Sequence, residues 1–162
     1  MSKAKAAVAA ASLAAILGGV TMYGDGYDFI KHYEGVKLKP YVDVAGVKTI
    51  CAGHTGYGVN RQVATQELCN ELMHVDLANA HAAIERHVTV ALPQSRGMAL
   101  LSFVFNLGET QFRKSTLLKK LNAGNTRAAC DELMRWIYAG GKVRHGLVLR
   151  RADERALCLI NS

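Results

Sequence analysis

Apolar residues recur at helical spacing through most of the chain after Thr65. Thr65 is a candidate N-cap for a long helix, Pro93 is expected to open the next helix, and Gly108 is expected to end it. The expected inward-facing residues of these two helices are Leu68, Leu72, Val75, Ala78, Ala82, Met98, Leu101, Val104 and Phe105. Further helices are predicted over residues 115–123, 126–138 and 147–160.

The segment before Thr65 has a different pattern. Residues 25–34 predict a short helix that Gly35 ends. Residues 36–50 are rich in valine and contain the turn Ala45-Gly46, which predicts a small hairpin or a three-stranded meander. No internal repeat, linker or low-complexity tract follows residue 25. We therefore expect a single α+β domain that is mostly helical.

The N-terminus carries 19 uncharged residues, Ala6 to Gly24. As a helix this stretch is about 28 Å long, close to the thickness of a bilayer core. Lys3 and Lys5 precede it and Asp25 follows it, so the positive-inside bias places the N-terminus in the cytoplasm. Seven alanines and three glycines make the stretch weakly hydrophobic, so such a helix could leave the bilayer.

We interpret residues 1–24 as a single-pass signal anchor. The domain over 25–162 is then exported to the other side of the membrane. A cleaved signal peptide is the alternative. The small-x-small site Gly19-Val20-Thr21, near the end of the stretch, is a weak cleavage site.

The composition limits the classes of molecule that the protein is expected to bind. The 162 residues include 20 Lys and Arg against 13 Asp and Glu, which gives a net charge of +7. This balance favours an anionic partner such as nucleic acid, an acidic membrane surface or a cell-wall polymer. Because no basic run with interleaved aromatic residues appears, nucleic acid is not expected. The six histidines lack metal-ligand spacing and no phosphate loop is present, so we expect no metal and no cofactor.

Three residues of one short segment suggest glycosidic-bond chemistry. Such cleavage needs an acid that protonates the leaving oxygen and a group that activates water on the other side of the ring. Glu34 is expected where helix packs on sheet, partly dry, which favours its neutral form and suits an acid. Asp43, beside a turn, is expected to stay ionised, and the hydroxyl of Thr49 could hold a water against it. Each of these residues alone is common in soluble domains, so the prediction depends on the combination of all three.

The spacing of these residues resembles a known family. Glu34, eight residues, Asp43, five residues and Thr49, followed by Ile-Cys-Ala-Gly-His-Thr-Gly, is similar to the catalytic signature of the phage lysozyme family, glycoside hydrolase family 24. Further similar motifs follow in the same order, and the match covers essentially all of 25–162. With its weak N-terminal span, the chain resembles signal-anchor-release endolysins of phages that infect Gram-negative bacteria. The further motifs are SFVFNLG at 102–108, STLLKKLNAG at 115–124, RWIYAGGK at 135–142 and GLVLRRADE at 146–154.

The resemblance implies a lysozyme-like fold with a cleft between a small β lobe and a larger helical lobe. It implies a muramidase that cleaves the β-1,4 bond between N-acetylmuramic acid and N-acetylglucosamine in peptidoglycan, with inversion, for host lysis. Glu34 would be the acid, Asp43 the base or electrostatic partner, and Thr49 the residue that positions water. We expect a monomer. The resemblance further implies a structural role for His54 and an ion pair of Glu34 with either Arg150 or Arg151. Phe103, Phe105 and Asn106 stand at positions of the family's cleft wall, although we expect the two aromatic side chains to serve in packing.

The four cysteines allow three pairings, and export permits disulfides. We expect Cys51 to pair with Cys69 and Cys130 with Cys158, each joining distant elements of one lobe; buried free thiols are the alternative. Residues 1–24 contain no cysteine, unlike relatives in which an anchor cysteine attacks an active-site disulfide.

The short distance between the span and the helix before Glu34 suggests a means of control. We expect the anchored form to be inactive in the host inner membrane, and loss of the membrane potential to favour its release into the periplasm, where the freed segment would pack on the body. Two other functions remain open. A lytic transglycosylase would cut the same bond without needing Asp43 or Thr49, and a non-catalytic membrane-anchored protein would only bind the wall.

Overall fold

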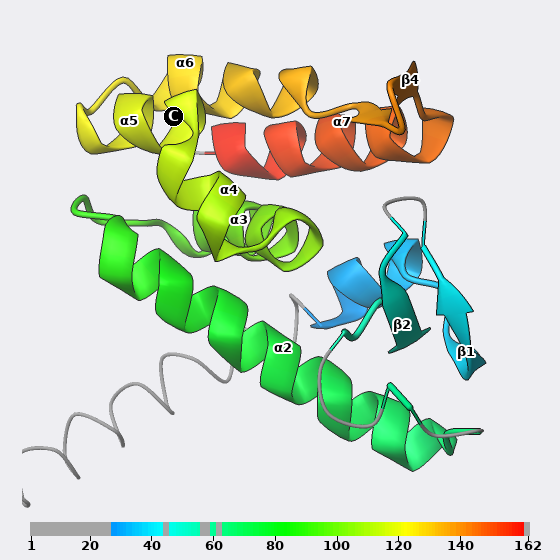
Figure 1. Ribbon diagram of the computed structural model, residues 1–162. Helices are drawn as coiled ribbons and strands as arrows, with labels where there is room; N and C mark the ends of the chain where they lie inside the picture. Colours follow the sequence, from blue (N-terminus) through cyan, green and yellow to red (C-terminus); the bar gives the residue numbers. More distant parts are fainter. Residues whose placement is uncertain (1–26, 44–45, 56–58, 61–62, 161–162) are drawn as a thin grey trace, which may run out of the picture.

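The computed structural model describes residues 27–43, 46–55, 59–60 and 63–160. The anchor expected over residues 6–24 lies outside these ranges. Within them, every helix is too short or too polar to cross a membrane. The described residues form a small β lobe, residues 34–55, and a larger helical lobe, residues 94–159, and the long helix α2 runs from beside one to beside the other (Figure 1).

The β lobe is built on a two-stranded antiparallel hairpin. Strand β1, Lys37–Val42, pairs with β2, Lys48–Cys51, and the register places Tyr41 opposite Thr49. Gly46 occupies the turn at a φ of 80°, which favours glycine. The hairpin prediction is confirmed; of the possible third strand, only the bridge between Ile50 and His54 is present among the described residues.

The remaining elements are mostly helices. Helix α3 lies at the centre and packs against both α2 and α7, and the largest cluster of buried apolar side chains surrounds it. The elements are α2 Gln66–His87, α3 Gln94–Leu107, α4 Glu109–Lys114, α5 Thr116–Asn122, α6 Thr126–Asp131, the 3-10 helix η1 Glu132–Arg135, β3 Tyr138–Ala139, β4 Lys142–Val143 and α7 His145–Leu159. The α+β, mostly helical prediction is therefore confirmed.

Helix α2 begins where its cap predicts. The Thr65 side chain accepts a hydrogen bond from the backbone N–H of Leu68 at 3.2 Å. The predicted inward face was right at Leu72, which is buried, and wrong at two positions, because Val75 is 52% exposed and Ala78 is also exposed. This helix has apolar residues on more than one side, so spacing alone did not select the buried stripe. That stripe consists of Cys69, Leu72, Met73, Leu77, Ala80, Ala83 and Ile84.

The predicted helix over 126–138 was also wrong in its second half. Helix α6 ends at Asp131, η1 follows, and Tyr138–Ala139 pairs with Lys142–Val143 in a hairpin. Gly140 and Gly141, both at positive φ, make its turn. Helix α4 was not predicted, because Gly108 ends α3 and is immediately followed by another short helix.

Candidate active site

One cleft is lined both by residues of the segment before α2 and by residues of the helices. Its volume is about 530 Å³. Glu34, Asp43 and Thr49, which the sequence singled out, all line it. The other described residues that line the cleft include Thr55, Asp76, Asn79, Arg86, Phe105, Asn106 and Glu109.

Glu34 follows the last residue of the helical segment 27–33. Its backbone N–H donates to the carbonyl of Ile30 at 3.1 Å, so the helical turn fixes the Glu34 backbone at the cleft. The side chain is 19% exposed. Oε1 accepts a hydrogen bond from Nη1 of Arg150 at 2.5 Å, whereas Oε2 has no polar partner among the described residues. One carboxyl oxygen is thus held and the other is available to a substrate.

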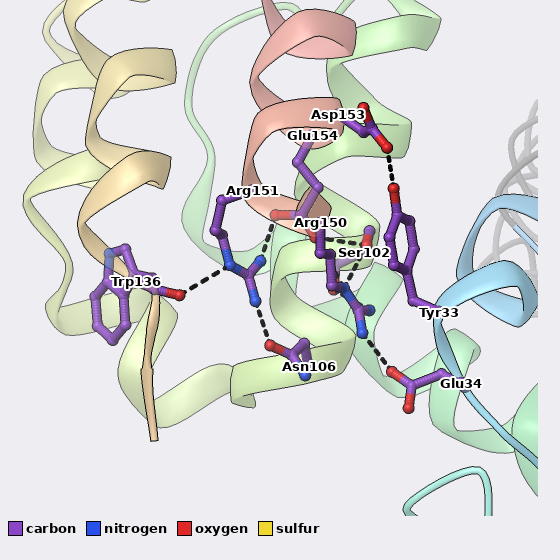
Figure 2. A network of polar contacts seen from close by, with 9 residues as sticks. All are labelled: Tyr33, Glu34, Ser102, Asn106, Trp136, Arg150, Arg151, Asp153 and Glu154. Atoms are coloured by element: carbon purple, nitrogen blue, oxygen red, sulfur yellow. Dashed lines mark hydrogen bonds and ion pairs between the residues drawn. The ribbon is translucent and has the colours of Figure 1, made fainter. Parts of the chain in front are cut away.

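Arg150 reaches Glu34 from inside the helical lobe (Figure 2). Its Nε donates to Oε1 of Glu154 at 3.1 Å and to Oγ of Ser102 at 3.2 Å, and its Nη2 donates to the Ser102 carbonyl at 3.1 Å. Ser102 Oγ in turn donates to Glu154 at 2.6 Å. Arg150, Ser102 and Glu154 are buried, so the guanidinium is held rigidly behind Glu34.

The neighbouring Arg151 points elsewhere. It donates to Glu154, to the side-chain oxygen of Asn106 and, at 3.2 Å, to the carbonyl of Trp136 (Figure 2). Burial lowers the pKa of Arg151, although the Glu154 carboxylate opposes this effect. Of the two arginines proposed as the partner of Glu34, Arg150 makes the contact, while Arg151 orients the cleft residue Asn106.

Tyr33 contributes to this arrangement although the sequence analysis gave it no role. Its hydroxyl donates to Asp153 of α7, and its ring lies 5.5 Å from the Arg150 guanidinium carbon (Figure 2). Burial, together with the bond to Asp153, raises the Tyr33 pKa. The residue before Glu34 is thereby fastened to the helix that carries Arg150. Because 120 residues separate Tyr33 from Asp153, no local signal could have paired them.

Asp43 and Thr49 lie at the turn end of the hairpin. Oδ1 of Asp43 accepts the backbone N–H of Val47 at 2.8 Å, which closes the turn. The Thr49 hydroxyl is buried and donates to the carbonyl of Tyr41 at 3.2 Å. Because that bond uses the hydroxyl hydrogen, the oxygen can still accept a hydrogen bond from water.

His54 connects the β lobe to α2. Its Nδ1 lies 2.8 Å from Oδ2 of Asp76, and its backbone bridges to Ile50. Nε2 is buried without a polar partner among the described residues. These contacts suit the structural role expected for His54. Asp76 was missed, since nothing in its sequence context separates it from other polar residues of a helix.

The cysteines form two disulfides in the structure, Cys51 with Cys69 and Cys130 with Cys158. The first joins β2 to α2 and the second joins α6 to α7, which is the pairing that the sequence analysis expected. Phe105 is half-buried and lines the cleft, whereas Phe103 is buried in the core of the helical lobe and is not among the described residues that line the cleft. In the described ranges no group of three or more His, Cys, Asp or Glu side chains could hold a metal ion.

Comparisons with known proteins agree with this geometry. The family model described as phage lysozyme matches residues 31–154. A SAR-endolysin of Bacteriophage PS119 is 46% identical over 127 residues, covering 78% of this chain and 76% of that protein. A SAR-endolysin of Escherichia phage Mu is 42% identical over 156 residues, covering 96% of this chain and 90% of that protein.

A solved structure is also similar. The crystal structure of a P22 lysozyme mutant matches with a TM-score of 0.69 and 39% identity, covering 83% of this chain and 95% of that chain. Sequence and fold thus lead to one assignment. The chain belongs to the phage lysozyme family.

Proposed function

We propose that this protein is an endolysin with muramidase activity, which hydrolyses the β-1,4 bond between N-acetylmuramic acid and N-acetylglucosamine to lyse the phage host. The observation that carries the proposal is that Glu34 and Asp43, from different elements, line the same cleft together with Thr49. Family membership and the endolysin relatives support the same activity.

In the proposed reaction Glu34 is the general acid. A glycan strand lies along the cleft, and Glu34 protonates the glycosidic oxygen as the bond to the anomeric carbon breaks. Arg150 positions the carboxyl group through Oε1, which leaves Oε2 for the substrate. The rigid bonds of Arg150 to Ser102 and Glu154 keep this geometry when the substrate binds.

Asp43 and Thr49 act on the water in this proposal. Asp43 removes a proton from a water molecule on the face of the sugar opposite Glu34, and the Thr49 oxygen accepts a hydrogen bond from that water. The water oxygen then bonds to the anomeric carbon from the face opposite the leaving group, so the configuration inverts.

The proposed location follows from the N-terminal stretch. Residues 6–24 would anchor the protein in the host inner membrane with the N-terminus in the cytoplasm, and the released monomer would act in the periplasm. The similarity to the Mu SAR-endolysin, which extends over 156 residues of this chain, supports an anchored and then released form. Equal specific muramidase activity in the membrane-bound and released fractions of one culture would contradict control by tethering.

Analysis of products by mass tests the activity itself. Purified peptidoglycan is digested with the wild-type protein and with Glu34→Gln. Hydrolysis predicts a reducing muramic acid end and a loss of activity in the variant. A 1,6-anhydro end would instead establish a lytic transglycosylase, and cleavage at the wild-type rate by Glu34→Gln would remove Glu34 from the mechanism.

A further inference from the structure

The cleft has an uneven distribution of charge. Four carboxylates line it, those of Glu34, Asp43, Asp76 and Glu109, although the whole chain is basic at +7. Among the described lining residues, Arg86 is the only one with a permanent positive charge. Of the described residues in the cleft wall, Arg86 is therefore the one that offers a permanently charged donor to an anionic group of a bound ligand.

Arg86 is held in place by Glu109, which His87 contacts in turn. Its Nε and Nη2 donate to the two carboxylate oxygens of Glu109 at 3.1 and 2.7 Å, a bidentate pair that joins the end of α2 to the start of α4. His87 Nε2 lies 2.8 Å from the same carboxylate. These bonds fix the plane of the guanidinium, and Nη1 makes no bond to Glu109.

The pair is also accessible. The Arg86 side chain is 53% exposed and that of Glu109 is 41% exposed. The charge of Glu109 is compensated by Arg86, as that of Glu34 is by Arg150, but Arg150 is buried behind Glu34 whereas Arg86 itself lines the cleft. A preorganised guanidinium on a cleft wall, whose Nη1 is not bonded to Glu109, suits recognition of a carboxylate.

We propose that Arg86 is a specificity-determining residue that binds a carboxylate of the peptidoglycan substrate, with Glu109 as the residue that positions it. The inference rests on the proposed muramidase function and adds a recognition site to it. Two sources supply this chemistry in the polymer. Carboxylates of the stem peptide are present on intact strands, and the lactyl carboxylate of N-acetylmuramic acid is exposed when the peptide is removed.

Three substrates separate these sources. The first is peptide-bearing glycan, the second is glycan stripped of its peptides by an amidase, and the third is stripped glycan whose lactyl carboxylates are methyl-esterified. For Arg86→Gln we expect KM to rise about tenfold on carboxylate-bearing substrate with kcat unchanged, because a charge-assisted hydrogen bond contributes about that much binding. On the esterified glycan the variant and the wild type should have equal KM.

A rise on the peptide-bearing glycan alone assigns the stem peptide, a rise on the stripped glycan alone assigns the lactyl group, and a rise on both shows that Arg86 binds either carboxylate. An equal rise on the esterified glycan, or no rise on any substrate, overturns the proposal. Arg155→Gln is the matched control, since Arg155 makes an exposed pair with Asp131 and does not line the cleft. Its KM should equal that of the wild type.

A second variant keeps the proposal testable if Arg86→Gln does not fold. Arg86→Lys retains the positive charge but not the fork of two donors, so it should raise KM less than Arg86→Gln and again only on carboxylate-bearing substrate. Failure of the proposed function would look different. In that case the wild type itself would release no reducing muramic acid ends from any of the three substrates.

Discussion

Arg150 donates a hydrogen bond to Glu34 at 2.5 Å across 116 residues of sequence. The guanidinium is itself held by Ser102 and by Glu154, which is fully buried. The relationship places a rigid, buried cation directly behind the carboxyl group that we propose as the acid. The position of Glu34 in the cleft thus depends on α7 as well as on its own helical turn.

Weakening this contact should reduce catalysis. In Arg150→Lys the charge is kept but the planar set of donors is lost, so Glu34 is no longer held in one orientation. We expect kcat to fall about 100-fold, with a smaller effect on KM, because small displacements of a catalytic group have effects of that size. Steady-state kinetics on peptidoglycan measures both constants. Arg135→Gln, which removes an exposed guanidinium from Glu132 while Lys120 still pairs with that carboxylate, is the control and should keep its activity. A kcat for Arg150→Lys equal to that of the control would argue against a positioning role.

Removal of the buried carboxylate should affect stability. Glu154 is the shared counter-ion of Arg150 and Arg151, so Glu154→Gln leaves the buried guanidinium of Arg151 without its anion and that of Arg150 with Glu34 alone. We expect the free energy of unfolding to fall by about 3–5 kcal/mol. Urea denaturation followed by circular dichroism gives this quantity. Glu85→Gln, at an exposed position of α2, should change it little, and equal stability of both variants would be inconsistent with the buried network.

The disulfide between Cys130 and Cys158 should stabilise the helical lobe. The two cysteines lie 28 residues apart in sequence and join α6 to α7. Replacing both by serine should lower the free energy of unfolding by about 3–4 kcal/mol, from the entropy gained by the unfolded chain. Denaturant unfolding of the variant under oxidising conditions tests this. If the variant is also less stable than the wild type when both are measured under reducing conditions, the loss of stability comes from packing and not from the disulfide.

Acid should weaken the pair at the end of the cleft. Hydrogen bonds from Arg86 and then from His87 lower the pKa of Glu109 from 4.5 to about 2. A carboxyl group with a lowered folded pKa stabilises the protein above its unfolded pKa and loses that contribution as the pH falls through the folded pKa. The stability advantage of the wild type over Glu109→Gln should therefore be full above about pH 5 and vanish near about pH 2. Unfolding free energies of both proteins across this range measure it. A difference that does not change with pH would contradict the lowered pKa.

The sequence predicted what depends on local signals. Thr65 accepts the capping hydrogen bond that its position suggests. Glu34, Asp43 and Thr49 lie within 16 consecutive residues, so a helix end and one hairpin are enough to bring them to one cleft.

The rest depends on contacts between distant segments. Adjacent residues of a helix point about 100° apart, so only the packing of α7 decides that Arg150 faces Glu34 and Arg151 faces Asn106. The helix predicted over 126–138 stops early in a region where the Trp136 carbonyl accepts a bond from Arg151 instead of a helical N–H. Neither the Tyr33 bond to Asp153 nor the Arg86 pair with Glu109 has a sequence signal.

The stereochemistry of the product shows whether Glu34 and Asp43 act from opposite faces of the sugar. If Glu34 and Asp43 act from opposite faces of the sugar with a water between them, the muramic acid end released from the β-linked glycan is first formed as the α-anomer. Proton NMR of a digest, recorded before mutarotation, distinguishes the two anomers. We expect the α-anomer as the first product. The β-anomer as the first product would mean retention, and it would contradict the proposed roles of Asp43 and Thr49.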